Sequence, residues 1–143
     1  MTAVADIQAL LGGETVTGPL RSELDLMRLV RRGVPTAAVD RFLETTHLGF
    51  GLIEKHVVPR RTFLRRRQSG QRLDPAESDR LVRLTRLVAQ ATETFGDESK
   101  ARVWLERRNR SLGGEAPLAL ADTDLGAREV ETLLGRIAHG LAA

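Results

Sequence analysis

Apolar residues recur three and four positions apart along most of this chain, which is the spacing of one face of an α-helix. The spacing predicts short helices over residues 2–11, 22–32, 35–45, 50–57 and 60–68, and longer helices over 74–95 and 124–141. A further helix, a loop and a short helix are predicted between residues 95 and 120. The chain is therefore expected to be all-α, with residues 13–19 as a linker.

Capping residues mark several of the expected helix ends. Asp74-Pro75-Ala76-Glu77 places an N-cap, a proline at the first helical position and an acid three residues after the cap, which together form a capping box. Other side chains of the capping type precede predicted helices, and they are Ser22, Asp97 and either Thr123 or Asp124. Glycines predict the ends, at Gly33, at Gly113-Gly114 and, for the last helix, at Gly140.

Each predicted helix has one apolar face. We expect the face of helix 22–32 to consist of Leu24, Met27, Leu29 and Val30, and that of helix 60–68 of Phe63 and Leu64. Helix 74–95 carries a longer seam that resembles one side of a coiled coil, formed by Leu81, Leu84, Val88, Ala91 and Phe95. The seam can pack within its own domain or against a second copy of the chain.

The composition is that of a globular protein with 41% hydrophobic and 29% charged residues. Aromatic residues make up only 3%, which favours a helical core of Leu, Val and Ala over a sheet. The chain has no cysteine, so a disulfide framework and a thiolate metal site are excluded. No apolar run suits a membrane span and the N-terminus lacks a basic signal-peptide region, so we expect a cytoplasmic protein.

Basic residues are concentrated in one segment. Residues 55–73 contain seven Lys and Arg and no acid, which leaves 15 basic and 19 acidic residues elsewhere. Such a patch is typical of a surface that binds nucleic acid, although many charged runs are solvated helix faces. Within the patch, helices 50–57 and 60–68 are joined by a tight turn, which is the pattern of a helix-turn-helix.

In that motif the second helix lies in the major groove, with its first residues at the base edges. Arginine is the commonest partner of guanine, and further arginines neutralise phosphates. Thr62 can reach a phosphate or cap the helix. The candidate DNA-binding residues are Arg60, Arg61, Thr62, Arg65, Arg66 and Arg67.

The only tryptophan, Trp104, lies in the stretch between residues 95 and 120. With Ala101 and Leu105 it forms an apolar face, so it is expected to be a core anchor. A protein-recognition surface is the alternative, because Trp and Arg dominate binding hot spots.

Catalysis is not expected, and neither is a cofactor or a metal ion. The histidines His47, His56 and His139 are scattered and belong to no nucleophile or metal-binding motif. Helix capping accounts for Asp122 and Asp124 more simply than acid–base chemistry does.

From about Leu29 to the C-terminus, the chain resembles the Xre/MbcA/ParS antitoxin family, the antitoxins of RES-domain toxins. The stretches that carry the resemblance are RRTFLRRRQSG, LDPAESDRLVRLTRLVAQATETFGD, KARVWLERRN, SLGGEAPLAL and DTDLGAREVETLLGRIAHG. One departure is Arg108, which stands where the family commonly has proline before Asn109.

The resemblance implies an N-terminal arm (1–21), an Xre-like helix-turn-helix domain (22–73) and a helical toxin-binding, dimerising domain (74–143). The expected protein is a homodimer that represses its own promoter and blocks the active site of a toxin that consumes NAD. The expected toxin-binding residues are Trp104, Asn109, Leu112, Gly113, Gly114, Arg136, His139, Leu141, Ala142 and Ala143. The alternative is a stand-alone repressor whose C-terminal domain only dimerises.

Overall fold

The structure is a computed structural model that describes residues 3–142, and it confirms the all-α fold. The described residues contain no strand, only α-helices and two short 3₁₀-helices (η1 and η2). In chain order the elements are α1 (Val4–Leu10), α2 (Glu14–Thr17), α3 (Glu23–Arg32), α4 (Thr36–Thr46), α5 (Phe50–His56), α6 (Arg60–Gln68), α7 (Pro75–Phe95), α8 (Glu98–Glu106), η1 (Arg110–Leu112), η2 (Pro117–Asp122) and α9 (Asp124–Ala142).

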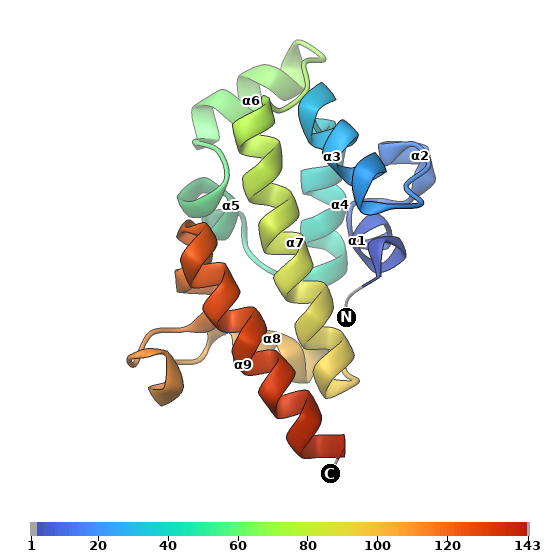
Figure 1. Cartoon of the computed structure of the whole chain (residues 1–143). Helices are drawn as coiled ribbons and strands as arrows, with labels where there is room; N and C mark the ends of the chain where they lie inside the picture. Colours follow the sequence, from blue (N-terminus) through green and yellow to red (C-terminus); the bar gives the residue numbers. More distant parts are fainter. Residues whose placement is uncertain (1–2, 143) are drawn as a thin grey trace.

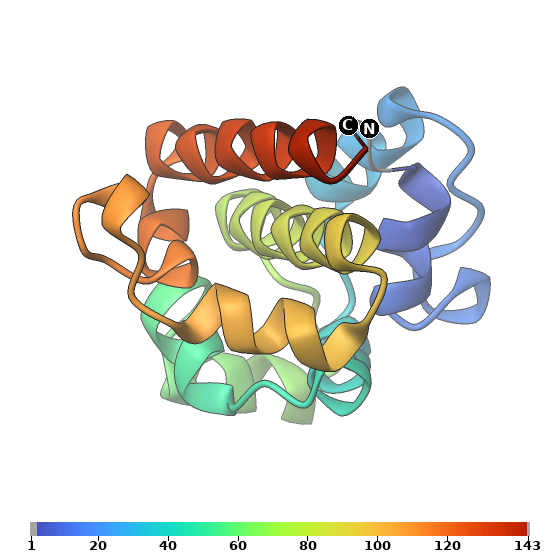
Figure 2. The ribbon, with the colours of Figure 1, turned by 90° about the horizontal axis from the view of Figure 1, so that it is seen from below.

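The long helix α7 is the centre of the fold (Figure 1). It contacts α1, α3, α4 and α5 from the N-terminal half of the chain and α8, α9 and η2 from the C-terminal half. Seen from below, α7 lies between α9 and α8, with the N-terminal helices along its side (Figure 2). Since one helix carries both halves, their relative position is fixed by packing and not by a linker.

The capping signals in the sequence predicted the helix starts correctly. At the start of α7, the carboxylate of Asp74 accepts a hydrogen bond from the Glu77 amide at 2.7 Å, and the Glu77 carboxylate accepts one from the Asp74 amide at 2.9 Å. For α9 the sequence left two candidates, and Thr123 is the capping residue, because its hydroxyl accepts from the Gly126 amide at 2.9 Å. These bonds satisfy amides that a helix start leaves without partners.

The apolar seam of α7 packs inside its own chain. Leu81, Leu84, Val88 and Ala91 are all buried, and Phe95 is half-buried against the same core. The helices that contact α7 are α1, α3, α8 and α9, among others. The seam is therefore the core of the protein, and it leaves no continuous apolar stripe for pairing with a second copy.

Three predictions about apolar faces are wrong. Leu24 and Met27 of α3 are 49% and 40% exposed, and Leu64 of α6 is 43% exposed. In α3 the buried residues are Leu26 and Leu29. Because Leu26 and Leu29 are also three apart, the sequence offers two overlapping apolar faces, and contact with α7 selects one of them.

Two predictions about breaks in helices are also wrong. The expected linker contains the short helix α2, which is held because the Gln8 amide donates to the Thr17 hydroxyl at 3.2 Å and to the Gly18 carbonyl at 2.7 Å. Gly140 does not end the last helix, since α9 continues through Ala142. A glycine lowers helix propensity by only about 1 kcal/mol, and packing of the rest of the helix outweighs that cost.

Two glycines permit close approach of backbones that a side chain would prevent. A Cβ on Gly33 would collide with the Leu73 carbonyl, and one on Gly126 would collide with the Leu120 carbonyl. Gly33 therefore lets the end of α3 lie directly against the loop after α6, and Gly126 lets the first turn of α9 lie directly against η2. Within residues 3–142, none of the helices combines the length and the apolarity that a membrane crossing needs.

Candidate functional site

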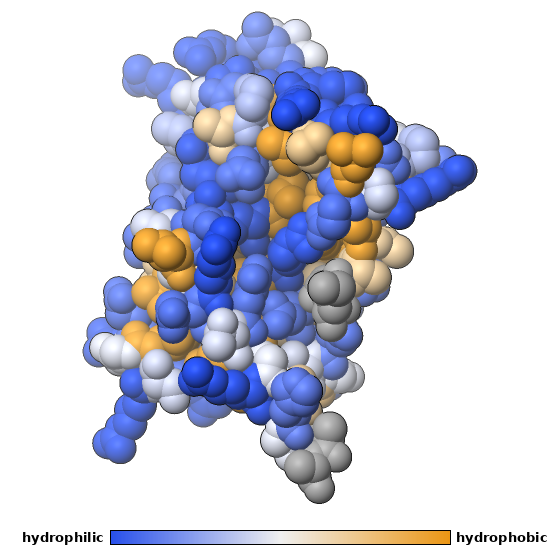
Figure 3. Space-filling view, in the orientation of Figure 1, coloured by the Kyte–Doolittle hydropathy of each residue, from blue (hydrophilic) through white to orange (hydrophobic). Residues whose placement is uncertain are grey.

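The predicted recognition helix α6 lies at one end of the molecule, next to the end of α3 (Figure 1). Its bounds are those predicted, and it follows α5 after the turn Val57-Val58-Pro59. Phe63 is buried and its ring centroid lies 5.3 Å from that of Phe50, which fixes α6 against α5. The opposite face of α6 is free, and the surface over this end is hydrophilic (Figure 3).

Arg61 and Arg65 are the most available of the predicted DNA-binding residues. Both are exposed, they lie one turn apart, and neither takes part in an ion pair with any described residue. Thr62 is half-buried beside them. Since Pro59 is the N-cap of α6 and no side chain caps this helix, Thr62 does not serve as the cap.

Arg60 and Arg67 are held at the surface by contacts with their own fold. The Arg60 guanidinium lies 4.5 Å from the Phe50 ring centroid and 3.1 Å from Glu54. Arg67 lies 5.1 Å from the Phe63 ring centroid and 3.1 Å from Asp40. Both side chains remain about half exposed, so stacking orients them while leaving their charge accessible.

Arg66 points the other way, toward α7. Its Nε lies 3.1 Å from Glu77 Oε1, and its Nη2 donates to Glu77 Oε2 at 3.4 Å. The Nε–H is not aligned for a hydrogen bond, so the contact through Nε is an ion pair. The Arg66 side chain is 20% exposed and that of Glu77 only 7%. Arg66 thus joins α6 to the capping box of α7.

Two further arginines at this end were missed by the sequence reasoning. Arg31 and Arg32 form the exposed last turn of α3, outside the acid-free segment that defined the patch. The Leu73 amide donates to the Val34 carbonyl at 2.9 Å, which ties the end of α3 to the loop after α6. The signal that could have revealed them is the Arg-Arg-Gly sequence at a predicted helix end, where the chain must turn.

Arg72 stabilises the same junction. Its Nη1 donates to the Gly33 carbonyl at 2.9 Å, so this side chain satisfies a backbone acceptor at the end of α3. The basic surface therefore consists of α6 together with the last turn of α3, held side by side by the loop from residue 69 to 73.

In the C-terminal half, the side chain of Trp104 is half-buried. Its ring centroid lies 5.5 Å from that of Phe95, while Ala101 and Leu105 on the same helix are buried. Val103 beside it is 53% exposed. One face of Trp104 therefore packs on the core, and its edge lies in a shallow hollow at the surface.

The loop after α8 is shaped by Asn109 and Leu112. The Asn109 side chain accepts from the Ser111 amide at 2.9 Å, and its backbone amide donates to the Glu115 carbonyl at 3.0 Å. Leu112 is buried. Gly113 and Gly114 are exposed at the tip with φ of 69° and 85°, a left-handed conformation that favours glycine.

Helix α9 is anchored at its start and exposed at its end. Ala127, Val130 and Leu134 are buried against the core. Arg136 and His139 are exposed, and Figure 1 shows α9 continuing beyond the end of α7. The last of the predicted toxin-binding residues are at the C-terminus: Leu141 and Ala142 are helical, and Ala143 lies outside the described residues.

Comparison with known proteins matches both halves of the chain. Residues 25–86 match the antitoxin Xre-like helix-turn-helix domain, and residues 90–140 match the antitoxin Xre/MbcA/ParS C-terminal toxin-binding domain. The "Antitoxin Xre" of Photorhabdus laumondii is 33% identical over 131 residues, covering 90% of this chain and 88% of the relative. The "Antitoxin Xre" of Yersinia enterocolitica is 39% identical over 85 residues (59% and 57%), and that of Pseudomonas putida 33% over 115 residues (80% and 64%).

A helix-turn-helix domain followed by a toxin-binding domain defines an antitoxin of a toxin–antitoxin system, a class that binds a toxin and DNA. The chain belongs to the Xre antitoxin family. The resemblance seen in the sequence is confirmed. The first matched range ends and the second begins within α7. The predicted domain boundary after residue 73 stays a prediction.

Proposed function

We propose that this chain is the cytoplasmic antitoxin of a RES-domain toxin that consumes NAD, that it blocks the active site of that toxin, and that it represses its own promoter. The observation that carries the proposal is the matched toxin-binding domain at residues 90–140. Two exposed surfaces at opposite ends of the molecule support it, the basic end at α6 and the free end of α9 (Figure 1).

For DNA binding we propose that the arginines have different roles. Arg61 and Arg65 are exposed and have no acid partner among the residues that the structure describes, so they enter the major groove, and Arg60 joins them from its stacked position. Thr62 and Arg67 contact phosphates at the edge of the groove. Arg66 is left out of the proposed contacts, because Glu77 holds it against α7.

Arg61→Ala tests the DNA contact. Loss of a bidentate contact with guanine should weaken binding to the promoter by about 1–3 kcal/mol and leave binding to unrelated DNA much less affected. A gel-shift titration with both DNAs measures the two affinities. The matched control is Arg128→Ala, which removes the same charge from the exposed side of α9 and should change neither. Equal promoter affinity of Arg61→Ala and the wild type would refute this role.

For the toxin we propose that the free end of α9 is the blocking element. Arg136 and His139 present exposed polar side chains on the last turns of this helix. Deletion of residues 141–143 should weaken neutralisation and spare promoter binding. The assay is growth and NAD content of cells that express the neighbouring gene product with either form of this chain. Full rescue by the shortened chain would contradict the blocking role, and a harmless neighbour would contradict the proposed toxin.

We also propose that the protein is a homodimer, so that two copies of α6 contact two half-sites. The apolar side chains left exposed on α3, Leu24 and Met27, support a surface for this contact, since the seam of α7 is buried. Light scattering after gel filtration should give twice the chain mass, and Met27→Lys should shift the mass toward the monomer. A monomeric wild type at micromolar concentration would refute the dimer.

A further inference from the structure

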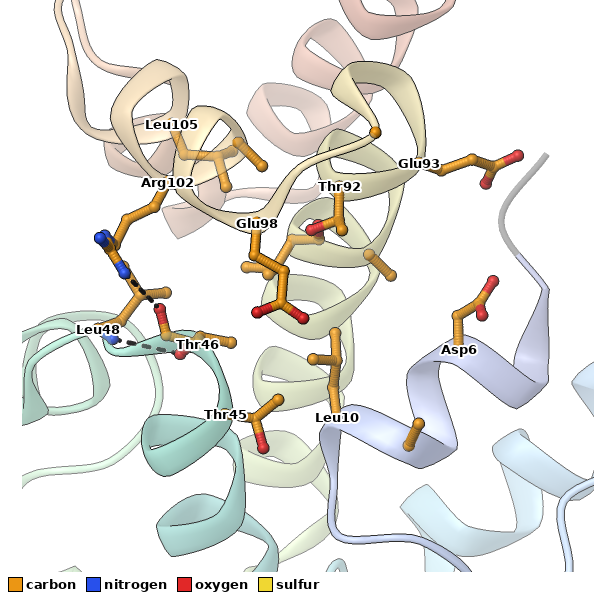
Figure 4. A pocket seen from close by; sticks show the side chains of 15 residues that line it. Asp6, Leu10, Thr45, Thr46, Leu48, Thr92, Glu93, Glu98, Arg102 and Leu105 are labelled. Atoms are coloured by element: carbon orange, nitrogen blue, oxygen red, sulfur yellow. Dashed lines mark hydrogen bonds between the residues drawn. The ribbon is translucent and has the colours of Figure 1, made fainter.

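A cavity of about 480 Å³ lies where α1, α4, α7 and α8 meet (Figure 4). Its lining thus comes from the N-terminal arm, the DNA-binding half, the central helix and the toxin-binding half. The volume is within the range of about 300–1,000 Å³ that is typical of small-molecule sites. Neither the predicted DNA contacts nor the predicted toxin contacts belong to this lining.

The floor of the cavity is apolar. Leu48, Val88, Ala89, Ala101 and Leu105 are buried there, with the half-buried Leu10 beside them. A floor of this kind holds a hydrocarbon body, because each apolar group that it covers is removed from water.

Two of the three threonine hydroxyls of the lining are already satisfied by the fold. The Thr46 hydroxyl donates to the Phe42 carbonyl at 2.8 Å and accepts from the Leu48 amide at 3.3 Å. The Thr92 hydroxyl donates to the Val88 carbonyl at 2.9 Å. These two hydroxyls need no ligand, which leaves the charged groups around the opening as the main source of selectivity.

Three carboxylates from three helices lie at the opening. Figure 4 shows the Glu98 carboxylate over the middle of the cavity, and those of Asp6 and Glu93 on the side away from Arg102. Within the part of the chain that the structure describes, none of the three carboxylates makes an ion pair or a side-chain hydrogen bond. Arg102 is the one cation that the described residues contribute to the lining, and its Nη1 faces the Thr46 carbonyl at 3.5 Å.

We propose that this cavity is a binding site for a small organic cation, a primary ammonium group on a hydrocarbon body. The body occupies the apolar floor, and the ammonium group lies among Asp6, Glu93 and Glu98. Three carboxylates and one guanidinium give the opening a net negative charge. A cation is therefore attracted by a Coulomb energy that a neutral molecule of the same shape lacks. An anion of that shape is repelled.

Binding there has a mechanical consequence. The ligand contacts helices from both halves of the molecule, so it stabilises their packing around α7. A ligand that binds only the folded chain raises the melting temperature as its concentration rises above its dissociation constant. The site therefore gives the cell a means to strengthen the junction between the DNA-binding and toxin-binding halves.

The first experiment compares three ligands of one shape. The full chain is titrated with n-hexylammonium, 1-hexanol and hexanoate, and amide chemical shifts are followed by NMR. Since the hydrocarbon body is common, the affinity ratios measure the charge alone. One exposed ion pair changes a binding constant by about twofold to fivefold, so three carboxylates predict hexylammonium about tenfold tighter than hexanol, with hexanoate weakest. Equal binding of the amine and the alcohol would overturn the proposal.

The second experiment locates the site. The double variant Glu93→Gln/Glu98→Gln should weaken hexylammonium about fourfold and leave hexanol unchanged, because the apolar floor is intact. Both side chains are exposed, so the variant folds as the wild type does. The control is Glu106→Gln, on α8 but outside the lining, which should change neither ligand. An equal loss in the control, or shifts spread over other acidic surfaces, would mean unspecific attraction and no site.

Discussion

Arg66→Ala is predicted to damage the fold more than it damages DNA binding, although Arg66 stands in the middle of the basic patch. The Arg66 side chain is 20% exposed and faces Glu77, whose side chain is 7% exposed. Removal of the guanidinium leaves the Glu77 carboxylate largely desolvated and takes away the arginine that it pairs with. Because a buried charge without its partner is costly, the free energy of unfolding should fall.

The size of this loss in stability depends on the interactions that Glu77 keeps in the variant. Loss of one member of a buried ion pair costs about 3–5 kcal/mol. Here Glu77 still accepts the Asp74 amide at 2.9 Å, and the Arg66 side of the pair is partly solvated, which lowers the cost. We therefore expect about 2–3 kcal/mol. A chain of this size changes its melting temperature by about 3 °C per kcal/mol, so the expected loss is about 6–9 °C.

Urea denaturation and calorimetry of Arg66→Ala and Arg65→Ala measure the difference. Arg65 is the neighbouring residue of the same helix, exposed and without an ion pair among the described residues, so its replacement should stay within about 0.5 kcal/mol. The double variant Arg66→Met/Glu77→Gln should recover about 1 kcal/mol of the loss, since it leaves no buried charge and keeps the capping hydrogen bond. If the variants at Arg65 and Arg66 are equally stable, the ion pair contributes nothing and the argument from burial is wrong.

Gly126→Ala should destabilise the chain by about 2 kcal/mol or more, because its Cβ would meet the Leu120 carbonyl. Gly135→Ala on the same helix has open space around the new Cβ and should stabilise the chain by about 0.5–1 kcal/mol. Chemical denaturation measures both changes in the free energy of unfolding. Burial lowers the pKa of His56, whose Nδ1 has no hydrogen-bond partner among residues 3–142. Below the usual pKa the unfolded chain therefore binds more protons than the folded one, and stability falls as pH drops from about 7 to 5. Calorimetry at the two pH values should show that His56→Gln reduces this slope and that His139→Gln, at an exposed position, does not. Arg32→Ala should weaken binding to all DNA sequences alike and lower the slope of log K against log salt by about 1, and an unchanged slope would remove α3 from the DNA contact.

The sequence predicted the elements whose signals are local. The capping box at Asp74 and Glu77 and the apolar seam as one face of α7 were both correct, because capping depends on residues three apart and the seam on a repeat within one helix. Whether the chain's own core or a second copy covers the seam was left open by the sequence. The bounds of α6 were correct for the same reason, since Pro59 and Ser69-Gly70 mark its two ends.

Predictions failed where a distant helix decided the outcome. Leu24 and Leu26 are equally apolar, and only the position of α7 buries one and exposes the other. The basic patch shows the same limit. The helical spacing places Arg65 on the same face as Arg61, but nothing in the sequence predicts that Arg66 is joined to Glu77, eleven residues further along the chain.

The shared helix α7 has a consequence for how the two halves act together. The helix-turn-helix match ends at residue 86 and the toxin-binding match begins at residue 90, both within α7, so no flexible segment separates the two domains. Val82 and Leu87 of this helix belong to the same buried cluster as Leu26 of α3 and Val130 of α9. The side chains that pack against α9 therefore belong to the same core as those that support α3 and the basic end. Because protein interiors are close-packed, the two halves share α7 as a common rigid element of their core.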